Sequence, residues 1–230
     1  MRRQARAPQG AASQPTVGTL KTRYESPTDL QALAQVLEKL SVDAGLSANL
    51  QAVITAYGLR VMLHDTDKQG MFERGSSIPT ERFTQLLRKM GPLFAQMQNQ
   101  MLIVGHTDSS QYADRSFLGY SNWTLSSNRA MAARIQLMAG GMPSSGFLQV
   151  VGMADRAPLD ANDTSSGINR RIEMLILTSG QSNTISAMFG QPGATQPFVD
   201  GADSAMPDHA ALQALRTQII QTKGGTATAN

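Results

Sequence analysis

Four short apolar runs, separated by stretches of helical spacing, constrain the fold of this chain more than any other feature. They lie at residues 59–63 (LRVML), 101–104 (MLIV), 147–151 (FLQVV) and 172–177 (IEMLIL). Nearly continuous apolar runs of this length are typical of strands buried on both faces. Strands that alternate with helices need crossover connections. The pattern therefore predicts an α/β (α+β) fold in which helices pack on a mixed sheet.

The segments between these runs carry helix signals. After 78–80 (IPT), apolar residues recur at helical spacing at 83, 86, 87, 90 and 93, although Gly91-Pro92 should kink or end this helix. Ser121 or Asn122 can cap a second helix that runs to Gly140-Gly141.

An N-terminal helix is predicted to begin near Ser26. An apolar stripe follows it at Leu30, Leu33, Ala34, Leu37 and Leu40. Gly45 should interrupt this helix, and 46–57 is expected to form a second short helix. The predicted organisation is a disordered lead-in at 1–25, a helical linker at 26–57, an α/β domain at 58–178 and a mostly disordered tail at 179–230, with a turn or two of helix at 210–220.

Composition excludes several classes of protein. The chain has 230 residues and no cysteine, which rules out a disulfide scaffold, a thiolate metal site and a cysteine nucleophile. Its 20 Lys and Arg exceed its 17 Asp and Glu, but five of the basic residues precede the first acid, Glu25. The excess of positive charge thus belongs to the lead-in, and with 5% aromatic residues we do not expect nucleic-acid binding.

No stretch approaches the roughly 20 apolar residues of a membrane span, and the basic start MRRQARAPQG has no apolar segment of a signal peptide behind it. As written, the chain is expected to be cytoplasmic.

The densest polar cluster follows the second apolar run. It comprises 105–108 (GHTD), 122–130 (NWTLSSNRA) and 168–172 (INRRI). Strand ends of open sheets expose ligand-binding groups, and helical geometry puts Arg129 just off a stripe of small residues that faces the sheet. Asp108 and Arg129 could thus face one another across a shallow pocket. The alternative is a structural salt bridge between them, with Arg170 and Arg171 solvated.

Enzymatic interpretations have less support. His106 and Asp108 share one side of an extended segment and could bind a metal, but the other histidines are only His64 and His209, so a hydrogen-bonded structural role for His106 is favoured. There is no G-x-S-x-G elbow and no Gly-rich phosphate loop. We therefore expect no catalytic residue, no metal and no cofactor.

Four motifs in order resemble the OmpA-like peptidoglycan-binding domain. They are GHTD at 105–108, N-x-x-L-S-x-x-R-A at 122–130, V-x-G-x-A-D at 150–155 and N-R-R-I at 169–172. The long insert before 119–123 (GYSNW) narrows the resemblance to the MotB flagellar stator family, including its lateral-flagellar members. The resemblance covers about 28–178.

The resemblance implies a βαβαββ two-layer sandwich with a pocket for the diaminopimelate of the peptidoglycan stem. It places the family's acidic and basic ligand residues on Asp108 and Arg129. The other positions that it assigns to the ligand-binding motifs are Thr107, Asn122, Leu125, Asn169 and Arg170. Diaminopimelate is a zwitterion at its free end, so a carboxylate and an arginine fork are complementary to it.

The resemblance also implies a periplasmic domain that is tethered to the inner membrane and works with a MotA-like membrane subunit. The membrane helix of such stators is missing from this sequence, so we expect a truncated, motor-incompetent relative rather than a soluble one with another route to the envelope. The alternative function is a soluble, self-associating module of the cell envelope that binds no peptidoglycan, in which the stripe at 28–40 pairs two copies into a homodimer. The other way to cover this stripe is for the helix to pack on its own domain.

Overall fold

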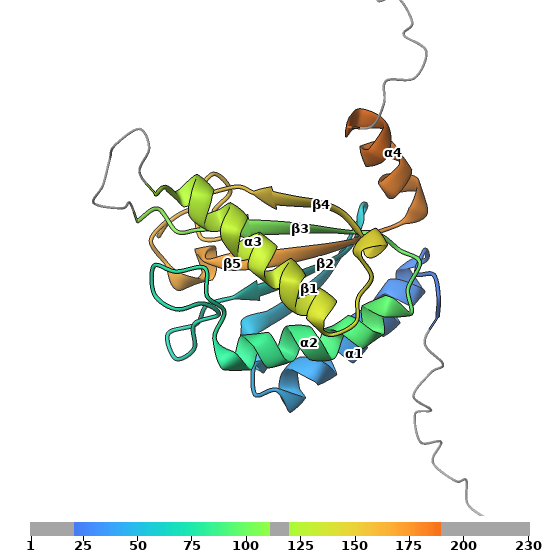
Figure 1. Cartoon of the computed structure of the whole chain (residues 1–230), viewed down its shortest axis with the longest axis horizontal. Coiled ribbons are helices and arrows are strands. Elements are labelled where there is room, and N and C mark those ends of the chain that lie inside the picture. Colours follow the sequence, from blue (N-terminus) through green and yellow to red (C-terminus); the bar gives the residue numbers. More distant parts are fainter. Residues whose placement is uncertain (1–20, 111–119, 190–230) are drawn as a thin grey trace, which may run out of the picture. The chain divides into compact units, whose positions relative to one another are not determined.

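The computed structural model describes residues 21–110 and 120–189. Its five strands form one sheet in the order β1-β2-β5-β3-β4 (Figure 1). Only β3 and β4 pair in parallel, and the other neighbours are antiparallel. The strands are β1 (Leu50–Thr55), β2 (Gly58–His64), β3 (Met101–His106), β4 (Phe147–Gly152) and β5 (Arg171–Leu177). The predicted mixed sheet, with strands at all four apolar runs, is confirmed.

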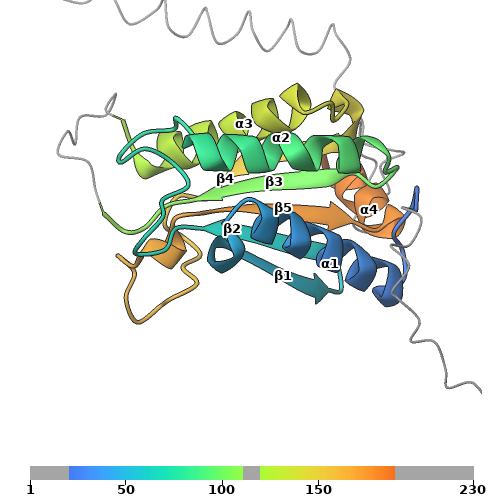
Figure 2. The same ribbon diagram turned by 90° about the horizontal axis from the view of Figure 1, so that it is seen from below.

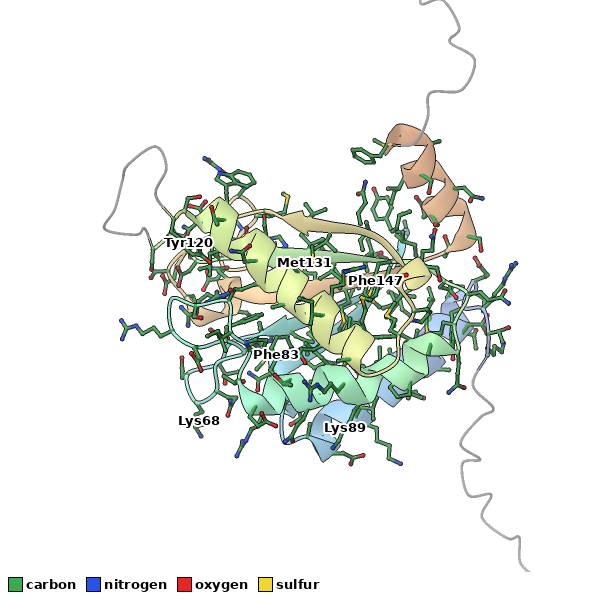
Figure 3. All side chains as sticks on the ribbon, viewed as in Figure 1. Lys68, Phe83, Lys89, Tyr120, Met131 and Phe147 are labelled. Carbon is green, nitrogen blue, oxygen red and sulfur yellow. The ribbon has the colours of Figure 1, made fainter. Side chains whose placement is uncertain are left out.

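Three helices pack on one face of this sheet: α1 (Pro27–Asp43), α2 (Glu81–Ala95) and α3 (Asn122–Ala139) (Figures 1 and 2). They share a single apolar core with the inward residues of β1, β2, β3 and β5. Phe83 of α2, labelled in Figure 3, is fully buried in it. This two-layer α+β arrangement is the one implied by the resemblance. No helix in the described ranges combines the length and apolarity that a bilayer span requires.

Helix α1 begins where the sequence predicts. Ser26 caps it, with the Asp29 N–H donating to Ser26 Oγ and the Ser26 N–H donating to an Asp29 carboxylate oxygen. Leu33 and Leu37 are completely buried in the core of the same chain. The expectation that this stripe pairs two copies is therefore wrong, because the domain itself covers it.

The expected helix at 46–57 is also wrong. Apart from a short 3-10 turn, Ser47–Asn49, this segment forms β1, which pairs with β2 from Leu50↔Leu63 to Thr55↔Gly58. Alternate residues Leu50, Ala52 and Ile54 face the core, as expected for a strand, in which side chains alternate between the two faces. The apolar content of so short a segment does not distinguish this pattern from that of a helix. Gly58, at φ +136°, allows the tight turn back into β2.

Pro92 does not end α2, which continues to Ala95. Of the two outcomes expected at Gly91-Pro92, a kink or an end, the end is therefore wrong. Proline deprives the Arg88 carbonyl of its helical donor. That carbonyl instead faces Gly140, where a Cβ would lie 2.2 Å from Arg88 O. The glycines at 91 and 140 therefore let α2 and the end of α3 approach closely at this proline.

The two ends of the described region are more ordered than the sequence predicts. Tyr24 is buried, and the Asn99 side chain binds both its N–H and its carbonyl. Beyond Thr178, helix α4 (Ser179–Phe189) replaces the expected disorder, and its last three residues belong to a second unit, Ala187–Asn230. The rest of the lead-in and tail, including the expected helix at 210–220, lies outside the described residues.

Helix α3 lies very close to the sheet at its N-terminal half. As predicted, Ser126, Ala130, Ala133 and Leu137 form a fully buried stripe. A Cβ on Gly105 of β3 would lie 2.1 Å from the Ser126 carbonyl oxygen, and one on Gly152 of β4 would lie 2.2 Å from Ser127 Oγ. This contact fixes the first turns of α3 over the ends of β3 and β4.

Candidate functional site

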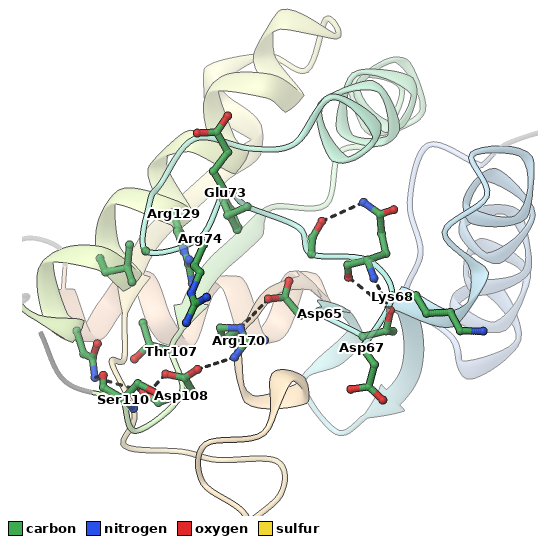
Figure 4. Close-up of a pocket in the computed structure, with 17 residues that line it drawn as sticks. Asp65, Asp67, Lys68, Glu73, Arg74, Thr107, Asp108, Ser110, Arg129 and Arg170 are labelled. Atoms are coloured by element: carbon green, nitrogen blue, oxygen red, sulfur yellow. Dashed lines mark hydrogen bonds and ion pairs between the residues drawn. The ribbon is translucent and has the colours of Figure 1, made fainter.

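A cavity of about 570 Å³ opens at the end of the sheet where β2 and β3 finish and β5 begins (Figure 4). The loop at 65–75 forms one wall, and the segment after β3 together with the first turns of α3 forms the other. Arg170, just before β5, lies between the two walls. Three segments that are far apart in the sequence therefore meet in one site.

The structure brings six of the seven candidate residues to this cavity: Thr107, Asp108, Asn122, Leu125, Arg129 and Arg170. Asn169 is not among the lining residues and is completely buried. Its side chain accepts from the Asp160 N–H at 3.0 Å and donates to the carbonyls of Asp160 and Asp163 at 3.3 and 2.9 Å. Asn169 therefore holds the loop before β5 in shape.

Arg170 joins two carboxylates. Its Nε donates to Asp65 Oδ2 at 2.7 Å, and its Nη1 donates to Asp108 Oδ2 at 2.6 Å. Burial alone would lower the pKa of Arg170, but the hydrogen bonds and charges of Asp65 and Asp108 outweigh it, so the pKa is raised. The alternative that this arginine is simply solvated is wrong. The three side chains form an acid–base–acid chain with one surplus negative charge.

Arg129 is held by the loop on the opposite wall. Its side chain projects from α3 and is almost fully buried, with Nε donating to the Ser76 carbonyl at 2.9 Å. Its guanidinium lies 4.9 Å from the centroid of the Phe72 ring, a cation–π contact. Arg129 and Asp108 thus line the same cavity in fixed positions, while Asp108 is ion-paired with Arg170.

Hydrogen bonds tie the segment after β3 to its neighbours. The Asn122 side chain donates to the carbonyls of Asp108 and Ser110 at 3.2 and 3.0 Å. The Thr107 N–H donates to the carbonyl of Ala154, whose left-handed φ of +49° is uncommon for a residue with a Cβ. Among the described residues, the buried Thr107 hydroxyl has no hydrogen-bond partner.

Sequence reasoning missed the wall at 65–75. Asp65 directly follows the apolar run of β2, and the antiparallel register His64↔Arg171 places it beside Arg170. Together with the predicted residues, this loop gives the cavity four acidic and four basic side chains. They are Asp65, Asp67, Glu73 and Asp108, and Lys68, Arg74, Arg129 and Arg170.

His106 lies on the opposite face of the sheet from the helices, because strand residues alternate and Gly105 faces α3. Its Nε2 is 3.5 Å from Glu173 Oε1, and within the described ranges neither ring nitrogen has a hydrogen-bond partner, so the expected hydrogen-bonded role is corrected. Burial, followed by the charge of Arg171, lowers its pKa to about 4 against the opposing effect of Glu173. The described part of the chain groups no three His, Cys, Asp or Glu side chains suited to a metal ion.

Comparisons with known proteins identify the family of the chain. The OmpA family matches residues 71–171. Flagellar export/assembly protein LafU from Escherichia coli O44:H18 is 40% identical over 80% of this chain, which spans 60% of that relative's length. Motility protein B from Escherichia coli K12 is 34% identical over 84% of this chain and 68% of its own length. A MotB-like protein from Desulfovibrio vulgaris, at 17% identity, has the same fold over 66% of this chain and 95% of its own, with a TM-score of 0.55. This chain therefore belongs to the OmpA-like family that includes motility protein B and LafU.

Proposed function

We propose that this chain binds peptidoglycan without catalysis and that its cavity holds the diaminopimelate of the stem peptide. The observation that carries the proposal is the cavity lining, in which Asp108 and Arg129 offer opposite charges to one ligand. A ligand that carries an ammonium and a carboxylate on one carbon is complementary to such a lining. A purely anionic or purely cationic ligand would be complementary to only one of these two side chains.

Each pole of the ligand has a partner of suitable chemistry. Asp108 accepts hydrogen bonds from the ammonium. Although Asp108 is ion-paired with Arg170, that arginine is shared with Asp65, so the three side chains together carry one surplus negative charge. Arg129 binds the carboxylate, because a planar guanidinium can donate two parallel hydrogen bonds. Leu125 supplies an apolar contact for the methylene chain between the two ends of diaminopimelate.

This function requires no bond to be made or broken, so the site needs no nucleophile or general base. The family resemblance supports the same conclusion, because it implies attachment of a domain to the cell wall in the periplasm. For intact members it also implies a partnership with a MotA-like membrane subunit. For this chain we propose only the attachment to the cell wall, because that function depends on residues that line the cavity.

The proposal is tested by sedimentation of the purified chain with isolated sacculi that contain diaminopimelate. Arg129→Ala removes a charged hydrogen-bonding partner that contributes roughly 1.5–3 kcal/mol, so the affinity for sacculi should fall at least tenfold. Arg134→Ala is the matched control, since Arg134 lies on the same helix but contacts the Phe147 ring instead of the cavity. Circular dichroism confirms that both variants remain folded.

A second comparison uses sacculi whose stems carry lysine in place of diaminopimelate. Lysine lacks the terminal carboxylate, so binding of the parent chain should weaken to the level of Arg129→Ala. Equal binding of the parent and Arg129→Ala to diaminopimelate sacculi would overturn the proposal, as would equal binding of the parent to both kinds of sacculi.

A further inference from the structure

We propose that Asp65 is the positioning residue of this site: it keeps Asp108 available to the ligand's ammonium and anchors the loop that supports Arg129. The inference rests on the proposed function and deepens it, because it assigns a role to an acidic residue outside the motifs that carry the family resemblance. Asp65 lies directly after β2, on the wall of the cavity opposite Asp108 (Figure 4).

The first role of Asp65 is electrostatic. Its Oδ2 accepts from Arg170 Nε at 2.7 Å, while Asp108 Oδ2 accepts from Arg170 Nη1 at 2.6 Å. The side chains of the two aspartates are only 11% and 12% exposed, so water screens these charges weakly. One guanidinium therefore serves two carboxylates, and the surplus negative charge attracts a cationic ligand group.

Without the charge of Asp65, Arg170 and Asp108 would form a balanced pair. The ammonium of the ligand would then approach the Asp108 carboxylate while Arg170 already neutralises its charge. The attraction that selects an ammonium over a neutral amide would fall, even if every residue that touches the ligand stayed in place.

The second role of Asp65 is to hold the loop. Its Oδ1 accepts from the Met71 N–H at 2.6 Å, which closes the turn at 65–71. The next residue, Phe72, contacts the guanidinium of Arg129 through its ring and forms a β-bridge with Pro79. One carboxylate thus connects both arginines of the cavity, Arg170 directly and Arg129 through the loop.

The substitution Asp65→Asn separates these two roles. The carbonyl oxygen of the new amide can still accept from the Met71 N–H, so the loop keeps its anchor, but the charge shared with Arg170 is lost. Asp67→Asn is the matched control, because Asp67 lies on the same loop but takes no part in the proposed contacts with the ligand. Its side chain is exposed and makes no hydrogen bond or ion pair within the described part of the chain. Both variants remove one negative charge from the same loop.

The experiment measures binding of two probes by calorimetry. One is a disaccharide tripeptide that ends in diaminopimelate with a free amine, and the other is the same muropeptide with that amine acetylated. The parent should prefer the free amine. Asp65→Asn should bind it about tenfold more weakly and lose most of the preference, whereas Asp67→Asn should stay within about twofold of the parent on both probes.

A spectroscopic signature tests the contact itself. The Nε–H resonance of Arg170 should be protected from exchange in the parent and in Asp67→Asn, and should lose protection in Asp65→Asn. If the parent binds the muropeptide and Asp65→Asn keeps both its affinity and its preference for the free amine, the inference is wrong while the proposed function stands. If the parent binds neither probe, the proposed function fails and the inference fails with it.

Discussion

Acidification should destabilise this domain through a single buried histidine. His106 is 3% exposed and lies among Glu173, Arg171 and Arg60 on the open face of the sheet. Burial and the neighbouring arginines lower its pKa from 6.5 to about 4 in the folded chain. The folded state therefore keeps the ring neutral over a pH range in which the unfolded chain protonates it.

The sign and size of the effect follow from linkage. Between pH 6.5 and about 4 the unfolded state binds more protons, so the free energy of unfolding falls as the pH falls. The gap between the two pKa values corresponds to about 3 kcal/mol once the pH is below both, and about 2 kcal/mol is already lost at pH 5. Well above pH 6.5 the contribution is fully present and constant.

Urea unfolding of the parent and of His106→Gln at pH 7.5, 6 and 5 measures this effect. Carboxylates that titrate in both proteins cancel when the two free energies are subtracted. The parent should lose about 2 kcal/mol relative to the variant between pH 7.5 and 5. A difference that does not change with pH would show that His106 titrates normally and that burial does not control its charge.

Three further predictions concern stability and are tested by urea unfolding at neutral pH. Gly105→Ala should cost about 1–3 kcal/mol or more because its Cβ would overlap α3, and Gly180→Ala, which meets no atom within 4 Å, should change stability by less than about 1 kcal/mol. Leu37→Ala should cost about 2–5 kcal/mol, whereas Val42→Ala, at an exposed position of the same helix, should cost under about 0.5 kcal/mol. Asn169→Ala should cost about 2–4 kcal/mol because it leaves backbone groups of the 160–163 loop unpaired. A cost below about 1 kcal/mol for any of the three buried sites would contradict the packing described for it.

The helices and strands could be predicted wherever the apolar pattern was compatible with only one type of secondary structure. The runs in β2, β3 and β5 are too short for helices and too apolar for surface strands, and the Ser26 and Ser121 caps follow from local hydrogen bonding. The segment at 46–57 was ambiguous because its apolar residues suit both periods, and only pairing with β2 decides between them. Helix α2 continues through Pro92 beside Gly140, and this close contact joins residues that are far apart in the sequence.

The site residues that lie in local sequence motifs could be predicted, and the residue whose role depends on long-range pairing was missed. Asp108 and Arg129 lie in motifs whose spacing puts them near strand ends, and the structure places both on one cavity. Asp65 carries no local pattern, because its importance comes from the register that brings β2 beside β5. Asn169 lies next to Arg170 in the sequence, but its side chain is turned into the loop.

The sheet order also determines how the domain would carry a mechanical load. The cavity lies at the end of the sheet where β5 begins, whereas Tyr24 and Leu177 meet through Asn99 at the other end. A pull between a ligand in the cavity and the chain beyond Leu177 would run lengthwise along β5. This strand is central and is bonded to β2 and β3 on its two sides, with hydrogen bonds perpendicular to the pull. The load would therefore shear many hydrogen bonds at once instead of opening them one after another, which is the geometry that resists force best.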